Sequence, residues 1–240
     1  MANLTFFDIV PLAVWLLASI ISLYFSIGNA RIWTSISTGF FLIFVNQAYL
    51  VAPWVNTPRL AALHSIVGTV AVMVLTHGFQ EYYVFSRTLE ATGRKSVIFI
   101  MTAAVILASA GFLVANPTPS PAVLRHIRLI ENSNWVFLSL INLDMIRKIL
   151  IQVKGTDIAR GFIAFSFVFV SIFIWRGSEL YLQVYGWDTQ WLSALATHGA
   201  QMSSADLARI AFSLEVHRVA ELTSSISVAA TFLYLFKLLR

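Results

Sequence analysis

Two residues near the C-terminus of the chain have the types and spacing of metal ligands. His217 and Glu221 are four residues apart, so in a helix they lie on one face, where a divalent metal can bridge them. The segment that contains them is strongly apolar, and an unpaired carboxylate in such a segment is costly. We therefore expect Glu221 to have a partner there, either a cation of the chain or a bound ligand.

Other polar residues are expected to gather at the same end of the folded chain. They lie near the ends of three further apolar segments, and the cluster consists of Asn46, Gln47, His64, Arg176, Glu179, His217, Arg218 and Glu221. Its candidate metal ligands are His64, Glu179, His217 and Glu221. The alternative interpretation is a set of ion pairs at helix ends, which need no special function: Arg176–Glu179, Glu215–Arg218 and Arg218–Glu221.

Histidines on facing helices are also the axial ligands that a haem b requires. His64 and His217 are the candidate pair, and Gly68, one turn after His64, would leave space for a flat ring. His77 follows His64 by 13 residues, which at about 100° per residue falls roughly 140° short of four whole turns. The two rings would face different sides of one helix, so the spacing favours one haem rather than two.

Polar residues at the opposite end have a simpler interpretation. His77 and Glu81 are spaced as an i,i+4 pair, and Asp144 precedes Arg147 and Lys148 by three and four residues. Such spacings predict local ion pairs on single helices.

The composition of the chain requires a membrane as its solvent. Of its 240 residues, 58% are hydrophobic and only 11% are charged, whereas soluble domains carry about 25% charged residues. Seven apolar segments have roughly the 20 residues that cross about 30 Å of hydrocarbon. The sequence predicts an all-α integral membrane protein, one transmembrane domain over residues 1–240 that forms a seven-transmembrane-helix bundle. The predicted spans are residues 6–27, 32–52, 60–85, 96–115, 134–153, 158–177 and 216–239.

One interfacial amphipathic helix is predicted between the sixth and seventh spans. Asp188 is a candidate N-cap, and the apolar stripe after it would lie in the plane of the membrane surface. Ser203 or Ser204 is expected to cap the next helix, which runs from Asp206 into the seventh span.

Basic residues are divided unevenly between the two ends of the predicted bundle. Ten of the 16 Lys and Arg residues fall on the side of the C-terminus, and such residues are enriched in cytoplasmic loops. We therefore expect a cell (inner) membrane protein with its N-terminus outside and its C-terminus in the cytoplasm. Most of the acids that we expect to be exposed lie on the outer side: Glu131, Glu179, Asp188, Asp206, Glu215 and Glu221.

Several chemistries are excluded by the residues that the chain contains. It has no cysteine, which excludes disulfides and thiolate metal sites, and it has no HExxH, GxSxG or Walker motif. No lysine lies in the middle of a span, where a retinal Schiff base would need one. The net charge of +5 follows from basic membrane loops, so nucleic acid is not an expected partner.

These features favour a multi-pass subunit of a larger membrane complex, related to electron transfer or membrane-bound oxidation, that is accessory rather than catalytic. Its outer cluster would hold one haem b, a divalent metal, a quinone or a lipid. Membrane lipids and other membrane-protein subunits are the expected partners. Two alternatives stay open, a seven-helix sensory or signalling module and a small transporter or metal-dependent membrane hydrolase.

Overall fold

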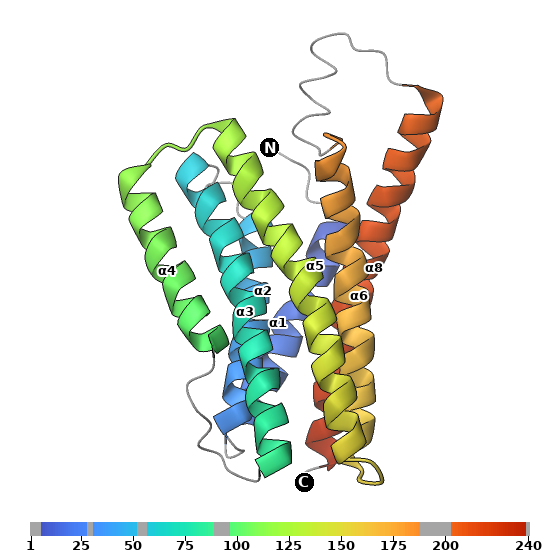
Figure 1. Ribbon diagram of the computed structural model, residues 1–240. Helices are drawn as coiled ribbons and strands as arrows, with labels where there is room; N and C mark the ends of the chain where they lie inside the picture. The colour runs from blue at the N-terminus through green and yellow to red at the C-terminus, as the bar shows by residue number, and fades with distance from the viewer. Residues whose placement is uncertain (1–5, 28–30, 52–56, 89–96, 188–202, 239–240) are drawn as a thin grey trace.

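The computed structural model of the chain is all-helical (Figure 1). It describes residues 6–27, 31–51, 57–88, 97–187 and 203–238. The described helices are α1 (Phe6–Ser26), α2 (Arg31–Val51), α3 (Pro58–Thr88), α4 (Val97–Ala115), α5 (Pro121–Gln152), α6 (Ile158–Val184) and α8 (Ser204–Leu238). The region of the predicted interfacial helix, residues 188–202, lies outside the described residues.

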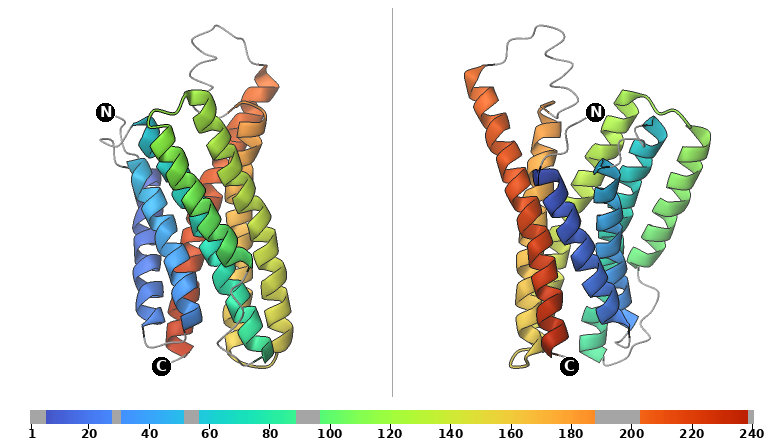
Figure 2. Two further views of the ribbon diagram at one scale, coloured as in Figure 1. Left: turned by 60° about the vertical axis from the view of Figure 1, so that its left-hand side comes forward. Right: turned by 180° about the vertical axis from the view of Figure 1, so that it is seen from behind.

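Six of these helices form a closed ring, and one lies outside it. Each of α1, α2, α3, α5, α6 and α8 packs against two neighbours in that order, with α8 returning to α1. Successive helices alternate in direction, so α3 and α5 run parallel (Figures 1 and 2). The helix α4 packs on the outer side of α3 and leans away from the ring (Figure 2).

Aromatic side chains fill the middle of the ring. Phe165 of α6 contacts Phe40, Phe79 and Phe232, which come from α2, α3 and α8, at centroid distances of 6.4, 5.2 and 5.5 Å. All four side chains are fully buried, and aromatic pairs at these distances add to the stability that apolar burial provides. The centre of the ring is therefore a packed core.

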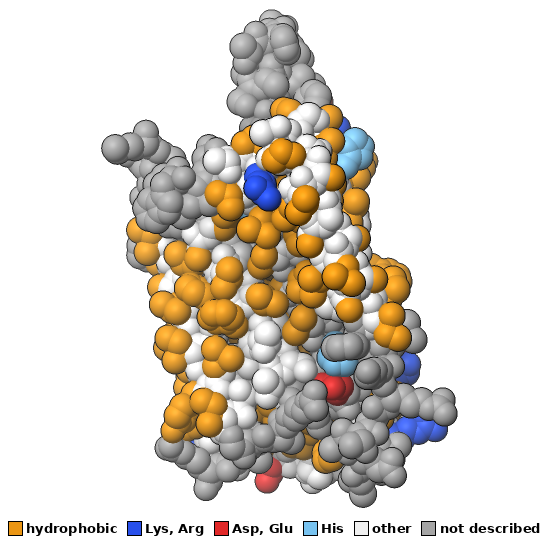
Figure 3. All heavy atoms as spheres, turned by 90° about the vertical axis from the view of Figure 1, so that its left-hand side faces the viewer, with side chains coloured by type: hydrophobic (Ala, Val, Ile, Leu, Met, Phe, Trp, Pro, Cys, Tyr) orange, Lys and Arg blue, Asp and Glu red, His pale blue; other side chains and the backbone are white. Residues whose placement is uncertain are grey.

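The surface and the helix lengths support a helical membrane protein. Among the described helices, α1, α3, α6 and α8 contain stretches long and apolar enough to cross a membrane. Figure 3 shows one face of the molecule, on which hydrophobic side chains dominate the middle and the charged ones lie toward the two ends. Thirty large hydrophobic side chains are exposed in the described part of the chain, which is the surface that a lipid solvent requires.

Two helices extend well beyond their predicted spans. The helix α5 begins at Pro121, with Ser120 as its N-cap, although its predicted span began at residue 134. The helix α8 begins at Ser204, and the Ser203 hydroxyl accepts a hydrogen bond from the Asp206 amide at 3.1 Å. The predicted cap of α8 is thus confirmed. The start of α5 was missed because its first turns carry polar residues that the sequence assigns to a loop.

Candidate functional site around Arg176

A buried arginine organises the polar end of the bundle. Arg176 lies on α6 and is only 4% exposed. Its Nη1 atom lies 3.3 Å from Glu179 Oε2 and 3.8 Å from Glu131 Oε1 of α5. A buried guanidinium needs such partners, because an uncompensated charge away from water is strongly destabilising.

Two tryptophans enclose the guanidinium. The Arg176 Cζ atom lies 4.1 Å from the centroid of the Trp175 ring and 5.3 Å from that of Trp135 on α5. Trp15 of α1 stacks on Trp175 at 6.1 Å. Cation–π contacts of this kind strengthen when they are desolvated, and all three tryptophans are buried. The arginine is therefore held in one position by rigid aromatic walls.

Gly68 of α3 allows the carboxylate of Glu131 to enter the site. A Cβ atom at this position would lie 1.9 Å from Glu131 Oε1 and 2.8 Å from Asn46 Nδ2. Asn46 of α2 in turn donates a hydrogen bond to the His64 carbonyl at 2.8 Å. Four helices thus meet around Gly68 and Arg176, and only glycine leaves the space in which their polar groups meet.

The site contains several buried polar atoms that lack a hydrogen-bond partner within the described chain. They are Asn46 Oδ1, His64 Nε2, Trp135 Nε1, Arg176 Nε and Arg176 Nη2. Buried polar groups are nearly always hydrogen-bonded in folded proteins. Arg176 Nε, Arg176 Nη2 and Trp135 Nε1 are donors only. Glu131 Oε1 is a buried acceptor without a hydrogen-bond partner in the described chain, 3.8 Å from Arg176 Nη1, so this end of the bundle contains both donors and acceptors that the described chain leaves unpaired.

The structure places the predicted site residues around Arg176. His217 Nε2 lies 3.3 Å from Trp175 Nε1 and 3.9 Å from Glu221 Oε2. An indole nitrogen can only donate, so His217 Nε2 is the acceptor. Glu179 acts electrostatically on His217 and on His64. His64, Glu179 and His217 therefore share one electrostatic environment, and Glu221 reaches it through His217.

This arrangement does not fit a haem between His64 and His217. The Nε2 atom of His217 accepts the Trp175 hydrogen bond, so its lone pair is engaged. The space beside Gly68, expected to receive a flat ring, holds the carboxylate of Glu131 and the amide of Asn46. Among the described residues, no three His, Asp or Glu side chains come together in a way that could hold a metal ion. The metal site stays a prediction from the sequence.

Glu131 was expected to be exposed, and that expectation was wrong. The residue is 2% exposed, because Arg176 and Gly68 provide a charge partner and a space for it inside the bundle. The sequence contained one signal for this position. Glu131, Trp135, Ser139 and Asn142 recur at intervals of four, four and three residues and lie on one face of α5.

Three ion pairs predicted from spacing are confirmed. Arg176 pairs with Glu179, as stated above, and Arg218 with Glu215 at 3.6 Å. At the opposite end of the bundle, His77 Nε2 lies 3.2 Å from Glu81 Oε1. The predicted contacts of Asp144 are also present, with Lys148 at 2.6 Å and Arg147 at 3.2 Å.

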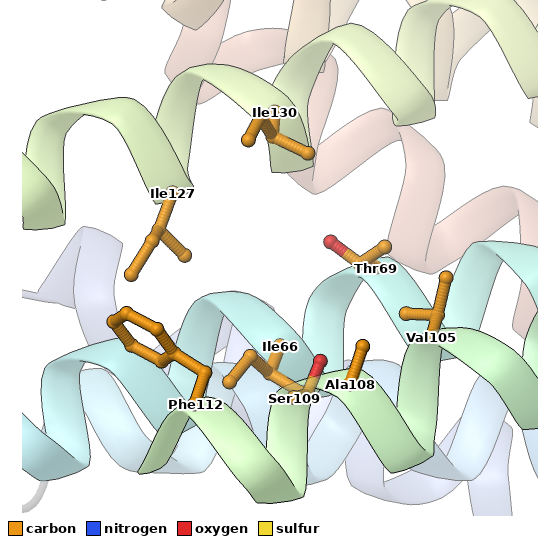
Figure 4. Close-up of a pocket in the computed structure, with 8 residues that line it drawn as sticks. All are labelled: Ile66, Thr69, Val105, Ala108, Ser109, Phe112, Ile127 and Ile130. Carbon is orange, nitrogen blue, oxygen red and sulfur yellow. The ribbon is translucent and has the colours of Figure 1, made fainter. Parts of the chain in front are cut away.

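An apolar groove lies between α3, α4 and α5, with a volume of about 220 Å³ (Figure 4). It is lined by Ile66, Thr69, Val105, Ala108, Ser109, Phe112, Ile127 and Ile130. The Thr69 hydroxyl donates to the Ser65 carbonyl at 3.0 Å, so it does not need a hydrogen-bond acceptor from a molecule bound in the groove. Thr69 and Ile130 adjoin Gly68 and Glu131 in the chain, so the groove lies at the same level of α3 and α5 as the polar site, on a neighbouring face of these helices.

The fold and the site together describe an all-helical protein with several membrane-type helices and a buried polar site at one end. Compared with protein-family models, with curated proteins and with solved structures, the chain gives no match. The interpretation of the site therefore depends on its own geometry and chemistry.

Proposed function

We propose that the chain is a seven-helix membrane subunit of an electron-transfer complex and that the site around Arg176 binds the head group of a quinone. The observation that carries the proposal is the set of buried donors without acceptors: Arg176 Nε, Arg176 Nη2 and Trp135 Nε1. A quinone presents two carbonyl acceptors on a flat ring. The Trp135 ring is the surface on which such a ring would stack, since the Trp175 ring is already covered by Arg176 and Trp15.

The charge of the site favours a neutral acceptor over an anion. Arg176 already faces the carboxylates of Glu131 and Glu179 at 3.8 and 3.3 Å. A phosphate or carboxylate ligand would bring a third negative group to one arginine. Like charges placed in close contact cost on the order of several kcal/mol. A quinone carbonyl accepts hydrogen bonds without adding charge.

The groove between α3, α4 and α5 suits the apolar tail of the same ligand. Its lining offers hydrocarbon and methyl groups, and it lies at the same level of α3 and α5 as the polar site. Ligand sites usually combine an apolar cavity with a few placed polar groups. With its head group at Arg176 and its tail in the groove, the quinone would have a polar environment for the head group and an apolar one for the tail.

The helix α4 is the proposed contact with a partner subunit. Its outer side exposes a continuous set of apolar residues, namely Ile100, Met101, Ile106, Leu107 and Val114, and among the ring helices it packs chiefly on α3. A peripheral helix of this kind can pack against another membrane protein. The sensory, transporter and hydrolase alternatives stay predictions from the sequence.

A binding titration tests the proposal. The purified protein in detergent is titrated with a short-tail quinone, and the saturable quenching of tryptophan fluorescence gives Kd. Trp135→Phe keeps the aromatic wall and removes only the Nε1 donor, so we expect about a 3- to 10-fold weaker Kd, the value of one hydrogen bond. Trp33→Phe is the matched control, because Trp33 packs against Phe25 and Tyr82 away from Arg176. Quenching that does not saturate, or an unchanged Kd for Trp135→Phe, would contradict the proposal.

A further inference from the structure

The parallel helices α3 and α5 are aligned with one constant offset. Asn142 Nδ2 donates to Thr76 Oγ1 at 3.1 Å, and the Ser86 hydroxyl donates to Gln152 Oε1; each pair is 66 residues apart in the chain. The same offset places Ser65 opposite Glu131, and these two side chains interact. Side chains at matching positions therefore face each other over the whole length of the interface.

Polar groups recur along this interface, although the same offset places Ser139 opposite Met73 and Gln80 opposite Ile146. Beside the interacting pair Ser65 and Glu131, the buried atoms Ser139 Oγ, Asn142 Oδ1 and Gln80 Oε1 have no hydrogen-bond partner in the described chain. Gln80 follows Thr76 by four residues and shares its helix face. From Ser65 to Gln80 the helix rises about 22 Å, which is most of a hydrocarbon layer about 30 Å thick.

Such a row requires water. Each buried polar atom without a partner costs about 1–3 kcal/mol, and Ser139, Asn142 and Gln80 each contribute one such atom beside the Ser65–Glu131 pair. A buried water typically makes about three hydrogen bonds to otherwise unsatisfied groups. We infer that water molecules bridge these atoms into one hydrogen-bonded row, which we name the α3/α5 row: Ser65, Thr76, Gln80, Glu131, Ser139 and Asn142.

We propose that the α3/α5 row conducts protons between Glu131 and the opposite end of the bundle, where Gln80 adjoins Glu81 of the His77–Glu81 pair. The proposal depends on the membrane-spanning part of the proposed function and goes beyond quinone binding. Polar and ionisable groups inside a membrane bundle are expensive, and proton relays are among the functions that they mark.

The surrounding packing makes protons, rather than larger ions, the conducted species. The centre of the ring is closed by Phe40, Phe79, Phe165 and Phe232, so the row is lateral and not a central pore. Hydroxyl groups and bridging waters can accept a proton at one hydrogen bond and release another from the same oxygen, as proton transfer requires. The amides of Asn142 and Gln80 accept and donate at different atoms, so they position the waters. At the end of the row, the carboxylate of Glu131 can bind the proton that the last water releases.

Proton flux into liposomes tests the proposal. The protein is reconstituted with a pH-sensitive dye inside the vesicles, and a potassium diffusion potential drives protons inward. Thr76→Val is isosteric and removes the acceptor of Asn142, so we expect the protein-dependent flux to fall at least 10-fold. Thr231→Val is the matched control, because Thr231 is a buried α8 residue whose hydroxyl donates within its own helix to Ser227. Wild-type flux equal to that of empty vesicles, or an undiminished flux for Thr76→Val, would overturn the proposal.

A second measurement does not depend on flux. The chain has no cysteine, so Ser139→Cys introduces a unique thiol into the row, and Ag⁺ reacts with thiols that water reaches. We expect Ser139→Cys to lose its free thiol at least 10-fold faster than Ser171→Cys, whose parent serine is buried on α6 and bonded to Phe167. Equal rates would overturn the water row. Neither experiment contains a quinone, so their failure is distinguishable from a failure of the proposed ligand site.

Discussion

Gly68 controls how closely the polar groups of four helices approach one another. The Glu131 carboxylate and the Asn46 amide occupy the space that any side chain at this position would fill. The Glu131 carboxylate then faces the Arg176 guanidinium, and both residues are almost fully buried. The site thus depends on a residue that has no chemistry of its own.

Gly68→Ala is expected to lower the free energy of unfolding by about 1–3 kcal/mol, the usual cost of overpacking a buried site. Denaturant unfolding in detergent micelles measures it. Gly111→Ala on α4 is the matched control, because a Cβ atom there meets nothing within 4 Å and alanine is the better helix former. Equal behaviour of the two variants would show that Glu131 does not lie against α3.

Arg176→Gln is expected to destabilise the protein by about 3–5 kcal/mol, because it leaves the Glu131 carboxylate buried without its cation. Arg209→Gln, at a side chain that is 63% exposed and paired with Asp206, should change stability by less than about 0.5 kcal/mol. The double variant Glu131→Gln with Arg176→Gln should recover part of the loss. Additive losses in this cycle would contradict a direct interaction between the two residues.

Residue types and spacing located part of the site and missed its centre. His64, Glu179 and His217 were expected at one end, and they lie around Arg176. The importance of Glu131 was missed, because its burial depends on a glycine of another helix and on an arginine 45 residues away in the chain. Local patterns contain no information about such non-local partners.

At the scale of elements, helix ends were predictable where a capping residue marks them. Ser203 was one of two caps predicted from the sequence for α8, whereas the start of α5 was missed because polar residues in its first turns interrupt its apolar pattern. The sequence also contained no signal that α4 packs outside the ring. Its apolar residues show no preferred face, so they fit a peripheral and a central position equally well.

Ser203→Ala is expected to loosen the first turn of α8. The Ser203 hydroxyl accepts from the Asp206 amide at 3.1 Å and donates to its carboxylate at 2.7 Å, and loss of such a cap costs about 1 kcal/mol. A loss of about 1 kcal/mol corresponds to a roughly fivefold change in the opening equilibrium, so hydrogen exchange of the first-turn amides should become roughly fivefold faster. Ser203→Thr should restore slow exchange. Unchanged exchange in Ser203→Ala would mean that the cap does not hold this turn.

At the scale of the whole molecule, the alternating helices give the connections two distinct ends. The α4–α5 connection lies at one end and the α5–α6 connection at the other (Figure 1). The uneven distribution of Lys and Arg residues predicts that the α5–α6 end faces the cytoplasm. This orientation also places the Arg176 site toward the outside.

Single cysteines test this orientation, since the natural chain contains none. Thr118→Cys and Thr156→Cys are matched exposed positions in the two connections. In intact cells, a membrane-impermeant maleimide should label Thr118→Cys, and it should label Thr156→Cys only after the membrane is opened. The reverse pattern would invert the bundle, and labelling of both in intact cells would contradict an odd number of crossings between them.

The most direct test of the central claim is the infrared carbonyl stretch of a quinone labelled with ¹³C at its carbonyl carbons and bound to the purified protein. If Arg176 and Trp135 donate to the head group, the stretch shifts to lower frequency than in lipid alone, and Trp135→Phe reverses part of the shift. Trp33→Phe should leave the spectrum unchanged. A carbonyl frequency equal to that of the free quinone in lipid would contradict a quinone site around Arg176.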